Sequence, residues 1–239
     1  MFLQLDPGNP DAEADIIARL ADEYQGDVDA SLRRTAQQVV ARLDPVALEN
    51  IEELIPTEAD DLREALERLL SASAGRGVRA VTDKLNQIAI GVDWQLANEE
   101  ARAWAAQYSY DLVRLLDDNS RAMLQRAVAR WVESGEPLDA LIDDVALIFG
   151  TERAKLIAVT EATRAYAEGS FTTYEQAGFN RRPPEAGRPP AHPGCRCWVS
   201  LSESDPGVWE YVWLTAVGER VCPICAPRHM TSIGFAGRR

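Results

Sequence analysis

The sequence predicts a mostly α-helical protein: a multi-helix bundle followed by a small C-terminal, cysteine-rich, zinc-knuckle-like module with short β-strands. Apolar side chains recur through most of residues 1–178 at the i, i+3, i+4 and i+7 spacing of a buried helical stripe. All four cysteines instead fall in the last 45 residues. Between these parts lies the segment RRPPEAGRPPAHPG, whose five prolines exclude a continuous helix. We therefore expect a boundary near Gly178.

The apolar stripes predict the helices in order. They indicate helices around residues 17–24, 32–43, 62–70, 85–92, 101–115, 124–131, 138–149 and 151–169. The long helix from Ala101 is predicted to end at Asp117-Asp118-Asn119. The next is predicted to end at Gly135, because glycine tolerates the left-handed conformation found just past helix ends. Strand-like residues occur only at 197–201 and 208–217, so any sheet should be small and close to the cysteines.

The charge of the chain is acidic and unevenly distributed. The formal net charge is −13, from 25 basic and 38 acidic residues, which argues against nucleic-acid binding over the whole surface. Residues 1–150 carry a net charge of −15 and residues 151–239 carry +2, which predicts different partners for the two parts. No apolar run reaches the length of about 18 residues that a membrane span needs, and the acidic start lacks the bases of a secretory signal. We expect a soluble protein made in the cytoplasm, without a membrane partner.

Two close cysteine pairs are the strongest chemical signal. They form the motifs C-R-C and C-P-I-C, which are separated by 24 residues: Cys195, Cys197, Cys222 and Cys225. Two such pairs joined by a loop can form a tetrahedral site, and thiolates select zinc or iron–sulfur over magnesium or calcium. We predict zinc, bound by the four cysteines or by three of them with His192 or His229 replacing one sulfur of C-R-C. Disulfides and free thiols are the alternatives.

The sequence predicts a structural metal rather than a catalytic one. A site with four protein ligands leaves no open position for water. The segment His192-Pro193-Gly194 lacks the glutamate of the H-x-E deaminase motif, and the motifs H-E-x-x-H, G-x-x-x-x-G-K-[ST] and G-x-S-x-G do not occur. We therefore expect the chain not to be an enzyme.

Glu161 is an unexpected residue in the helical part. It stands seven residues after Ala154, on the same apolar stripe. A carboxylate in that position must find a partner or lose its charge. We interpret Glu161 as a structural residue that contacts an arginine or the backbone amides of a neighbouring helix start, in preference to a catalytic group.

Arginines and tryptophans surround the cysteine motifs. The arginines are Arg181, Arg182, Arg188, Arg196, Arg228, Arg238 and Arg239. Their planar guanidinium groups suit phosphate or carboxylate partners, so contact with DNA or an acidic protein is one interpretation and an ordinary solvated surface is the other. Trp198, Trp209 and Trp213 are predicted to fill the core of the module rather than to stack on bases.

Three segments carry a resemblance to a known family. The run TERAKLIAVTEATRAYAEGSFTTYEQAG contains an R-A-x-x-I-x-x-T-E pattern that ends at Thr160 and Glu161, Trp213 precedes V-C-P-I-C, and the proline-rich segment ends in P-P-A-H-P-G-C-R-C. Together they resemble the phage head-morphogenesis family, the minor head proteins that include the F protein of phage Mu. The resemblance covers about residues 95–229. In the family C-x-x-C precedes H-P-x-C-R-C, whereas here the order is reversed.

The resemblance implies a structural minor head protein of a tailed phage or prophage. It implies a location in the virion capsid after assembly in the host cytoplasm, a role in head assembly or DNA delivery, and contact with the portal protein, the major capsid or scaffold protein and the packaged DNA. Thr160 and Glu161 would fix the signature helix against its neighbours. The chain would then divide into an N-terminal helical region (1–95), a head-morphogenesis core (96–178) and a proline-rich linker with the metal-binding module (179–239).

Two other functions remain as alternatives. A zinc-dependent hydrolase or nuclease would use Glu161 with His192 or His229 at an open metal position. A DNA-binding module would act through the C-terminal arginines, and its affinity would fall steeply with salt.

Overall fold

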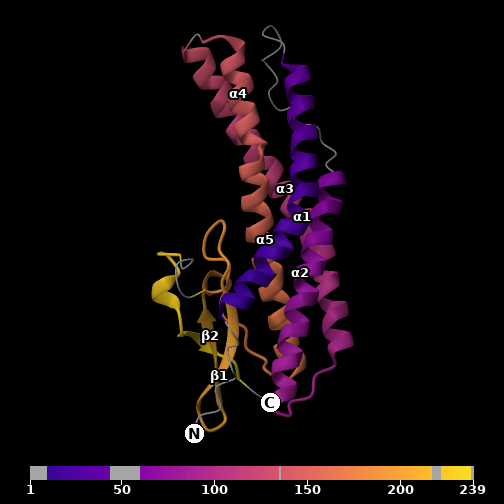
Figure 1. Cartoon of the computed structure of the whole chain (residues 1–239), viewed down its shortest axis with the longest axis vertical. Coiled ribbons are helices and arrows are strands. Elements are labelled where there is room, and N and C mark those ends of the chain that lie inside the picture. The colour runs from indigo at the N-terminus through magenta and orange to yellow at the C-terminus, as the bar shows by residue number, and fades with distance from the viewer. Residues whose placement is uncertain (1–9, 44–59, 135, 217–221, 238–239) are drawn as a thin grey trace.

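The computed structural model describes residues 10–43, 60–134, 136–216 and 222–237. Five α-helices lie in these ranges: α1 (Pro10–Arg42), α2 (Asp60–Gln87), α3 (Trp94–Ser134), α4 (Leu138–Ile148) and α5 (Thr151–Gln176). They form an elongated bundle, and a small sheet lies beside its lower half (Figure 1). The predicted fold class, mostly α with a small C-terminal sheet near the cysteines, is confirmed. Within the same ranges, no helix has both the length and the apolar character that crossing a membrane requires.

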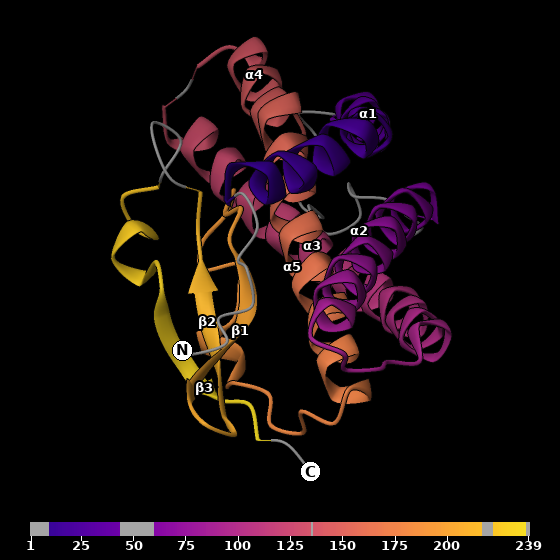
Figure 2. The same cartoon turned by 60° about the horizontal axis from the view of Figure 1, so that its bottom comes forward.

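Helix α5 is the central element of the fold. It packs against α1, α2 and α3 and also against strand β1 (Trp198–Asp205), so that it lies between the helices and the sheet (Figure 2). Sixteen of its 26 residues are buried. The helix that carries the R-A-x-x-I-x-x-T-E pattern therefore contacts both parts of the molecule.

Two glycines allow the backbones of α2 and α5 to touch. A Cβ atom on Gly77 of α2 would lie 2.1 Å from the carbonyl oxygen of Tyr166, and one on Gly169 of α5 would lie 2.0 Å from that of Ala74. Only a residue without a side chain fits at these points. The prediction that this helix ends near Gly169 is wrong, because Gly169 serves the helix contact and α5 continues to Gln176.

Helix α2 ends before the predicted stripe at 85–92 does. Ala89 has a φ of 57°, and the N–H of Ile90 donates to the carbonyl of Leu85 at 3.0 Å. This left-handed cap stops the helix at Gln87. Leu85 and Ile90 are both buried, one inside α2 and one just after its end. The apolar spacing at 85–92 therefore reflects burial on both sides of a helix end and not a separate helix.

Helix α3 runs through Asp117-Asp118-Asn119, so the predicted end at this triplet is wrong. Leu112 and Leu124 are buried on either side of the triplet, and their packing outweighs its weak helix propensity. The stripes at 101–115 and 124–131 consequently belong to one helix. Gly135, the predicted end of the second stripe, lies outside the described residues.

The sheet is antiparallel, with the strands in the order β1-β2-β3. Strand β2 (Val208–Leu214) pairs with β1 through a hairpin that contains Gly207, and β3 (Thr231–Phe235) pairs with the other edge of β2. The predicted segments 197–201 and 208–217 overlap β1 and β2, and residue 217 lies outside the described residues. Strand β3 was not predicted, because TSIGF is short, contains a glycine and is largely exposed.

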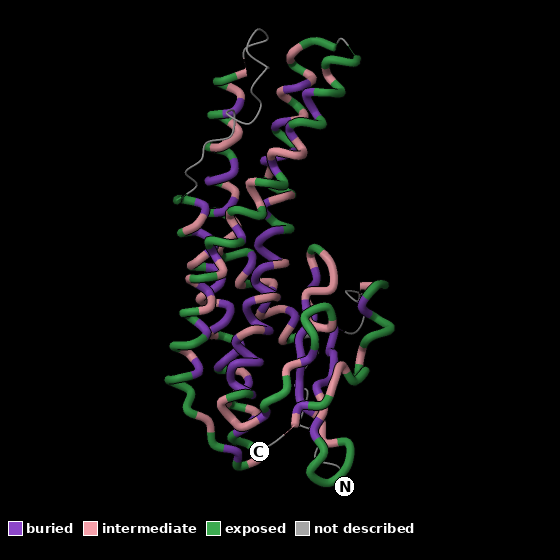
Figure 3. The backbone as a smooth tube through the Cα atoms, turned by 180° about the vertical axis from the view of Figure 1, so that it is seen from behind, coloured by how far each residue is buried: buried purple, intermediate pink, exposed green. Residues whose placement is uncertain are grey.

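The helices and the sheet share their apolar cores. Trp198 of β1 packs in one cluster with Tyr166 of α5, and Trp209 of β2 packs in another with Phe171 of α5. Trp198, Trp209 and Trp213 are buried; Trp213 packs with the cysteines in the module, whereas Trp198 and Trp209 pack where the sheet meets α5. Buried residues follow the inner faces of the helices and run on into the sheet (Figure 3).

Candidate metal centre

The sheet topology brings the two cysteine motifs together. C-R-C ends at the start of β1, and C-P-I-C lies in the connection from β2 to β3. Trp198 at the start of β1 pairs with Leu214 at the end of β2, and Trp213 pairs with Thr231 at the start of β3. All three strand ends therefore meet at one end of the sheet, and so do the loops that carry the cysteines.

Two groups of donor side chains share one cysteine. The first group contains His192, Cys222 and Cys225, and the second contains Cys195, Cys197 and Cys225; within each group the donor atoms lie within 4.8 Å of one another. His192 Nε2 lies 3.1 Å from Cys222 Sγ and 3.2 Å from Cys225 Sγ. The sulfurs of Cys195 and Cys225 are 3.8 Å apart. These five side chains are called the cysteine–histidine cluster below.

The separation of the Cys195 and Cys225 sulfurs suits two ligands of one metal ion, and the arrangement contains no disulfide. A tetrahedral ion with metal–sulfur bonds of about 2.3 Å has sulfur–sulfur edges of about 3.8 Å. A disulfide bond is only about 2.05 Å long. All four cysteines are free thiols. The cysteine–histidine cluster can therefore hold a metal ion, and the disulfide alternative is not the arrangement of this structure.

Local backbone hydrogen bonds position the donors. The N–H groups of Cys225 and Ala226 donate to the carbonyl of Cys222 at 3.0 and 2.8 Å, forming the tight turn of C-P-I-C. Nδ1 of His192 donates to the carbonyl of Pro193 at 2.8 Å. This bond leaves Nε2 as the acceptor nitrogen, facing the two sulfurs, which is how metal-binding histidines are commonly oriented.

The thiols differ in acidity. A hydrogen bond from Cys197 lowers the pKa of Cys195 to about 5, and the same bond together with burial raises the pKa of Cys197. Burial raises the pKa of Cys225 to about 12. A metal ion replaces such thiol protons, because the thiolate is the ligand.

The cysteine–histidine cluster is partly buried. Cys195, Cys197 and Cys225 are buried, whereas His192 and Cys222 are half-buried. The adjoining cavity has a volume of only about 90 Å³. Small-molecule sites have volumes of roughly 300–1,000 Å³. The space beside the cluster is therefore smaller than a typical substrate site.

Two threonines of α5 fasten the C-R-C loop. The N–H of Gly194 donates to the hydroxyl of Thr160 at 2.9 Å, and the hydroxyl of Thr163 donates to the carbonyl of Cys195. Thr160 thus contacts the cysteine loop; the family resemblance implies that it fixes this helix against its neighbours. Thr163 was missed, because a threonine on a helix carries no sequence signal for a loop that arrives about 30 residues later.

Replacing Thr163 with valine is expected to lower the free energy of unfolding by about 2 kcal/mol, because the buried carbonyl of Cys195 loses its donor while the side-chain volume stays nearly constant. Thr173→Val is the matched control. The hydroxyl of Thr173 donates only to the Gly169 carbonyl within α5, so its loss should cost less than about 1 kcal/mol. Chemical denaturation measures both, and equal losses would contradict a special role for Thr163.

Glu161 has the arginine partner that the sequence analysis expected. Its carboxylate accepts from Arg164 Nε at 3.0 Å and is buried. The guanidinium of Arg164 lies over the ring of Tyr108, 5.7 Å from its centroid. Burial raises the pKa of Glu161, and Arg164 and Tyr108 oppose that rise. Within the described residues, Glu161 belongs to neither donor group of the cysteine–histidine cluster.

His229 lies outside both donor groups in the part of the chain that the structure describes. Its Nδ1 accepts from the N–H of Thr215 at 3.3 Å. Of the two histidines proposed as substitutes for a sulfur, the structure therefore brings His192 to the cysteines.

The arginines near the cysteine motifs have several different environments. Arg182 forms ion pairs with Glu168 and Glu175, and Arg188 donates to the carbonyl of Pro183 at 2.7 Å. Both guanidinium groups lie over the ring of Phe171. The protein already provides partners for these two side chains.

Five further arginines belong to the predicted set, and three of them lie in the described residues. Arg228 lies over the ring of Trp213, 5.1 Å from its centroid, and Arg196 lines the small cavity beside the cysteine–histidine cluster. The backbone N–H of Arg181 donates to the carbonyl of Ala236 at 3.0 Å. Arg238 and Arg239 lie outside the described residues.

Comparisons with protein-family models, with curated proteins and with solved structures give no match to this chain. The resemblance to the phage head-morphogenesis family therefore stays a hypothesis that rests on the motifs quoted above.

Proposed function

We propose that the chain is a structural, non-enzymatic minor head protein of a tailed phage or prophage, with a C-terminal module stabilised by one zinc ion. The observation that carries the proposal is the convergence of C-R-C, C-P-I-C and His192 against the helix with the R-A-x-x-I-x-x-T-E pattern. These are the segments on which the family resemblance depends.

His192, Cys195, Cys222 and Cys225 form the proposed ligand set. His192 Nε2 lies 3.1 and 3.2 Å from the sulfurs of Cys222 and Cys225, and the sulfur of Cys225 lies 3.8 Å from that of Cys195, so Cys225 links these four side chains. Three thiolates and one imidazole are a common structural zinc site, and zinc imposes the tetrahedral geometry that four protein ligands complete. Cys197 then acts as a neighbouring thiol that donates to Cys195.

A structural role is favoured over hydrolysis by three features. A complete set of protein ligands leaves no position for an activated water. The adjoining cavity of about 90 Å³ is small, and Glu161 is engaged by Arg164 instead of facing the cysteines.

The role in the phage head rests on the family resemblance and on charge. A bundle whose first 150 residues carry a net charge of −15 is repelled by packaged DNA and attracted to a basic protein surface. The portal protein is the proposed partner, with the major capsid or scaffold protein as further contacts. Because these partners form the head, we propose that the chain lies inside the capsid.

The test is the location of the chain in purified particles of the phage that encodes it. We expect quantitative mass spectrometry to find a few copies per head, retained with the portal when the shell is dissociated. Heads assembled without the portal gene are the matched control and should lack the chain. Absence of the chain from complete heads would contradict the proposal.

A further inference from the structure

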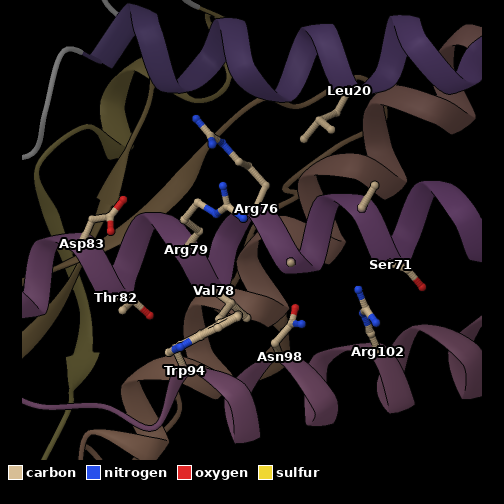
Figure 4. A pocket seen from close by; sticks show the side chains of 12 residues that line it. Leu20, Ser71, Arg76, Val78, Arg79, Thr82, Asp83, Trp94, Asn98 and Arg102 are labelled. Atoms are coloured by element: carbon tan, nitrogen blue, oxygen red, sulfur yellow. The ribbon is translucent and has the colours of Figure 1, made fainter.

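A larger cavity lies between α1, α2 and α3 and shares no lining residue with the cysteine–histidine cluster. Its volume is about 690 Å³, which falls in the range of small-molecule sites. Asn98 and Arg102 of α3 point toward α2, while Leu20 of α1 lies on the opposite side (Figure 4). We call it the bundle cavity.

The bundle cavity concentrates positive charge in an acidic part of the chain. Its lining includes Arg76, Arg79 and Arg102 but only one carboxylate, that of Asp83. In the described ranges none of these three arginines forms an ion pair, whereas six other arginines of the helices do: Arg33, Arg34, Arg63, Arg68, Arg130 and Arg164. Guanidinium groups around one cavity repel each other unless an anion lies between them, and phosphate oxygens match their geometry.

The same cavity has an aromatic surface beside the arginines. Trp94, Asn98 and Arg102 stand four residues apart and so share one face of α3. The side chain of Trp94 is 56% exposed, and an exposed indole is a surface on which a nucleobase stacks. The amide of Asn98 offers a donor and an acceptor to the polar edge of a base.

We propose that the bundle cavity binds a nucleoside phosphate, with the base stacked on Trp94 and the phosphate between the guanidinium groups. A free nucleotide and the terminal nucleotide of a single strand present the same chemistry to these side chains. The inference is independent of the phage assignment and of the metal ion.

The test uses the full chain and calorimetric titration with ADP, adenosine, inorganic phosphate and a 5′-phosphorylated oligonucleotide. We expect ADP to bind with a stoichiometry of one and adenosine and inorganic phosphate to bind at least about tenfold more weakly, because each supplies half of the contacts. The double variant R79Q/R102Q should weaken ADP binding by at least about tenfold, and Trp94→Ala by about tenfold. Trp94→Phe should retain most of the affinity.

Arg126→Gln is the matched control, because Arg126 is an exposed arginine on α3 that lines no part of the bundle cavity. It should leave the affinity for ADP unchanged. An equal loss in Arg126→Gln, equal affinities for ADP and inorganic phosphate, or no binding of any of the four compounds would overturn the proposal. If it holds, tighter binding of the oligonucleotide than of ADP identifies a strand end as the occupant, and the reverse identifies a free nucleotide.

Discussion

Replacing Cys225 with serine should release the metal ion and lower the free energy of unfolding by about 4 kcal/mol. Cys225 is the donor that the two groups share, and it is fully buried. A hydroxyl is a poor ligand for zinc, and without the ion the two cysteine loops lose the metal–ligand bonds that join them. Zinc content by elemental analysis and stability by chemical denaturation measure the two effects.

Cys197→Ala is the matched control for this prediction. It also removes a buried thiol, but Cys197 is not in the proposed ligand set, so the variant should keep one zinc ion per chain. A chelator should lower the stability of the unmodified chain toward that of Cys225→Ser. It should change the stability of Cys225→Ser itself little. Full zinc content in Cys225→Ser would show that the ligand set is wrong.

Replacing Gly169 with alanine should lower the free energy of unfolding by about 3 kcal/mol. Alanine is intrinsically the better helix former by about 1 kcal/mol, so propensity alone predicts the opposite sign. The new methyl group would lie 2.0 Å from a carbonyl oxygen of α2, and helix backbone cannot yield as a flexible side chain does. Thermal or chemical denaturation of the purified variant measures the loss.

Gly26→Ala provides the matched control. Gly26 is an exposed residue inside α1, and a Cβ atom there meets nothing within 4 Å. This substitution should raise stability by about 0.5–1 kcal/mol. Gly77→Ala should behave like Gly169→Ala, because its Cβ would meet the backbone of α5. Stabilisation in both contact variants would contradict the close packing of α2 on α5.

Much of the fold follows from spacing along the sequence. The stripe of apolar residues around Ala154 and Ile157 predicts a buried helix, and α5 confirms it. Helix ends were harder to predict, because they depend on packing. Glycine is typical of helix ends, but Gly169 lies where α5 contacts α2. Helix α3 continues through the polar triplet at 117–119 because leucines are buried on both sides of it.

The candidate metal centre could be predicted in part. The cysteine spacing predicts the sulfur donors of a metal site, because a single loop between two close cysteine pairs is enough to bring the pairs together. The choice between His192 and His229 could not be predicted, since it depends on a turn at Pro193 and on a hydrogen bond from Thr215. The bundle cavity was also missed: Arg76 and Arg79 belong to α2 whereas Trp94 and Arg102 belong to α3, and only the packing of the two helices brings them together.

The most direct test of a structural metal centre is the zinc-edge X-ray absorption spectrum of the purified chain. We expect one zinc ion with three sulfur ligands at about 2.3 Å and one nitrogen ligand at about 2.0 Å. A spectrum that requires an oxygen ligand, as from an exchangeable water, or a chain that contains no metal after purification with zinc present, would contradict it.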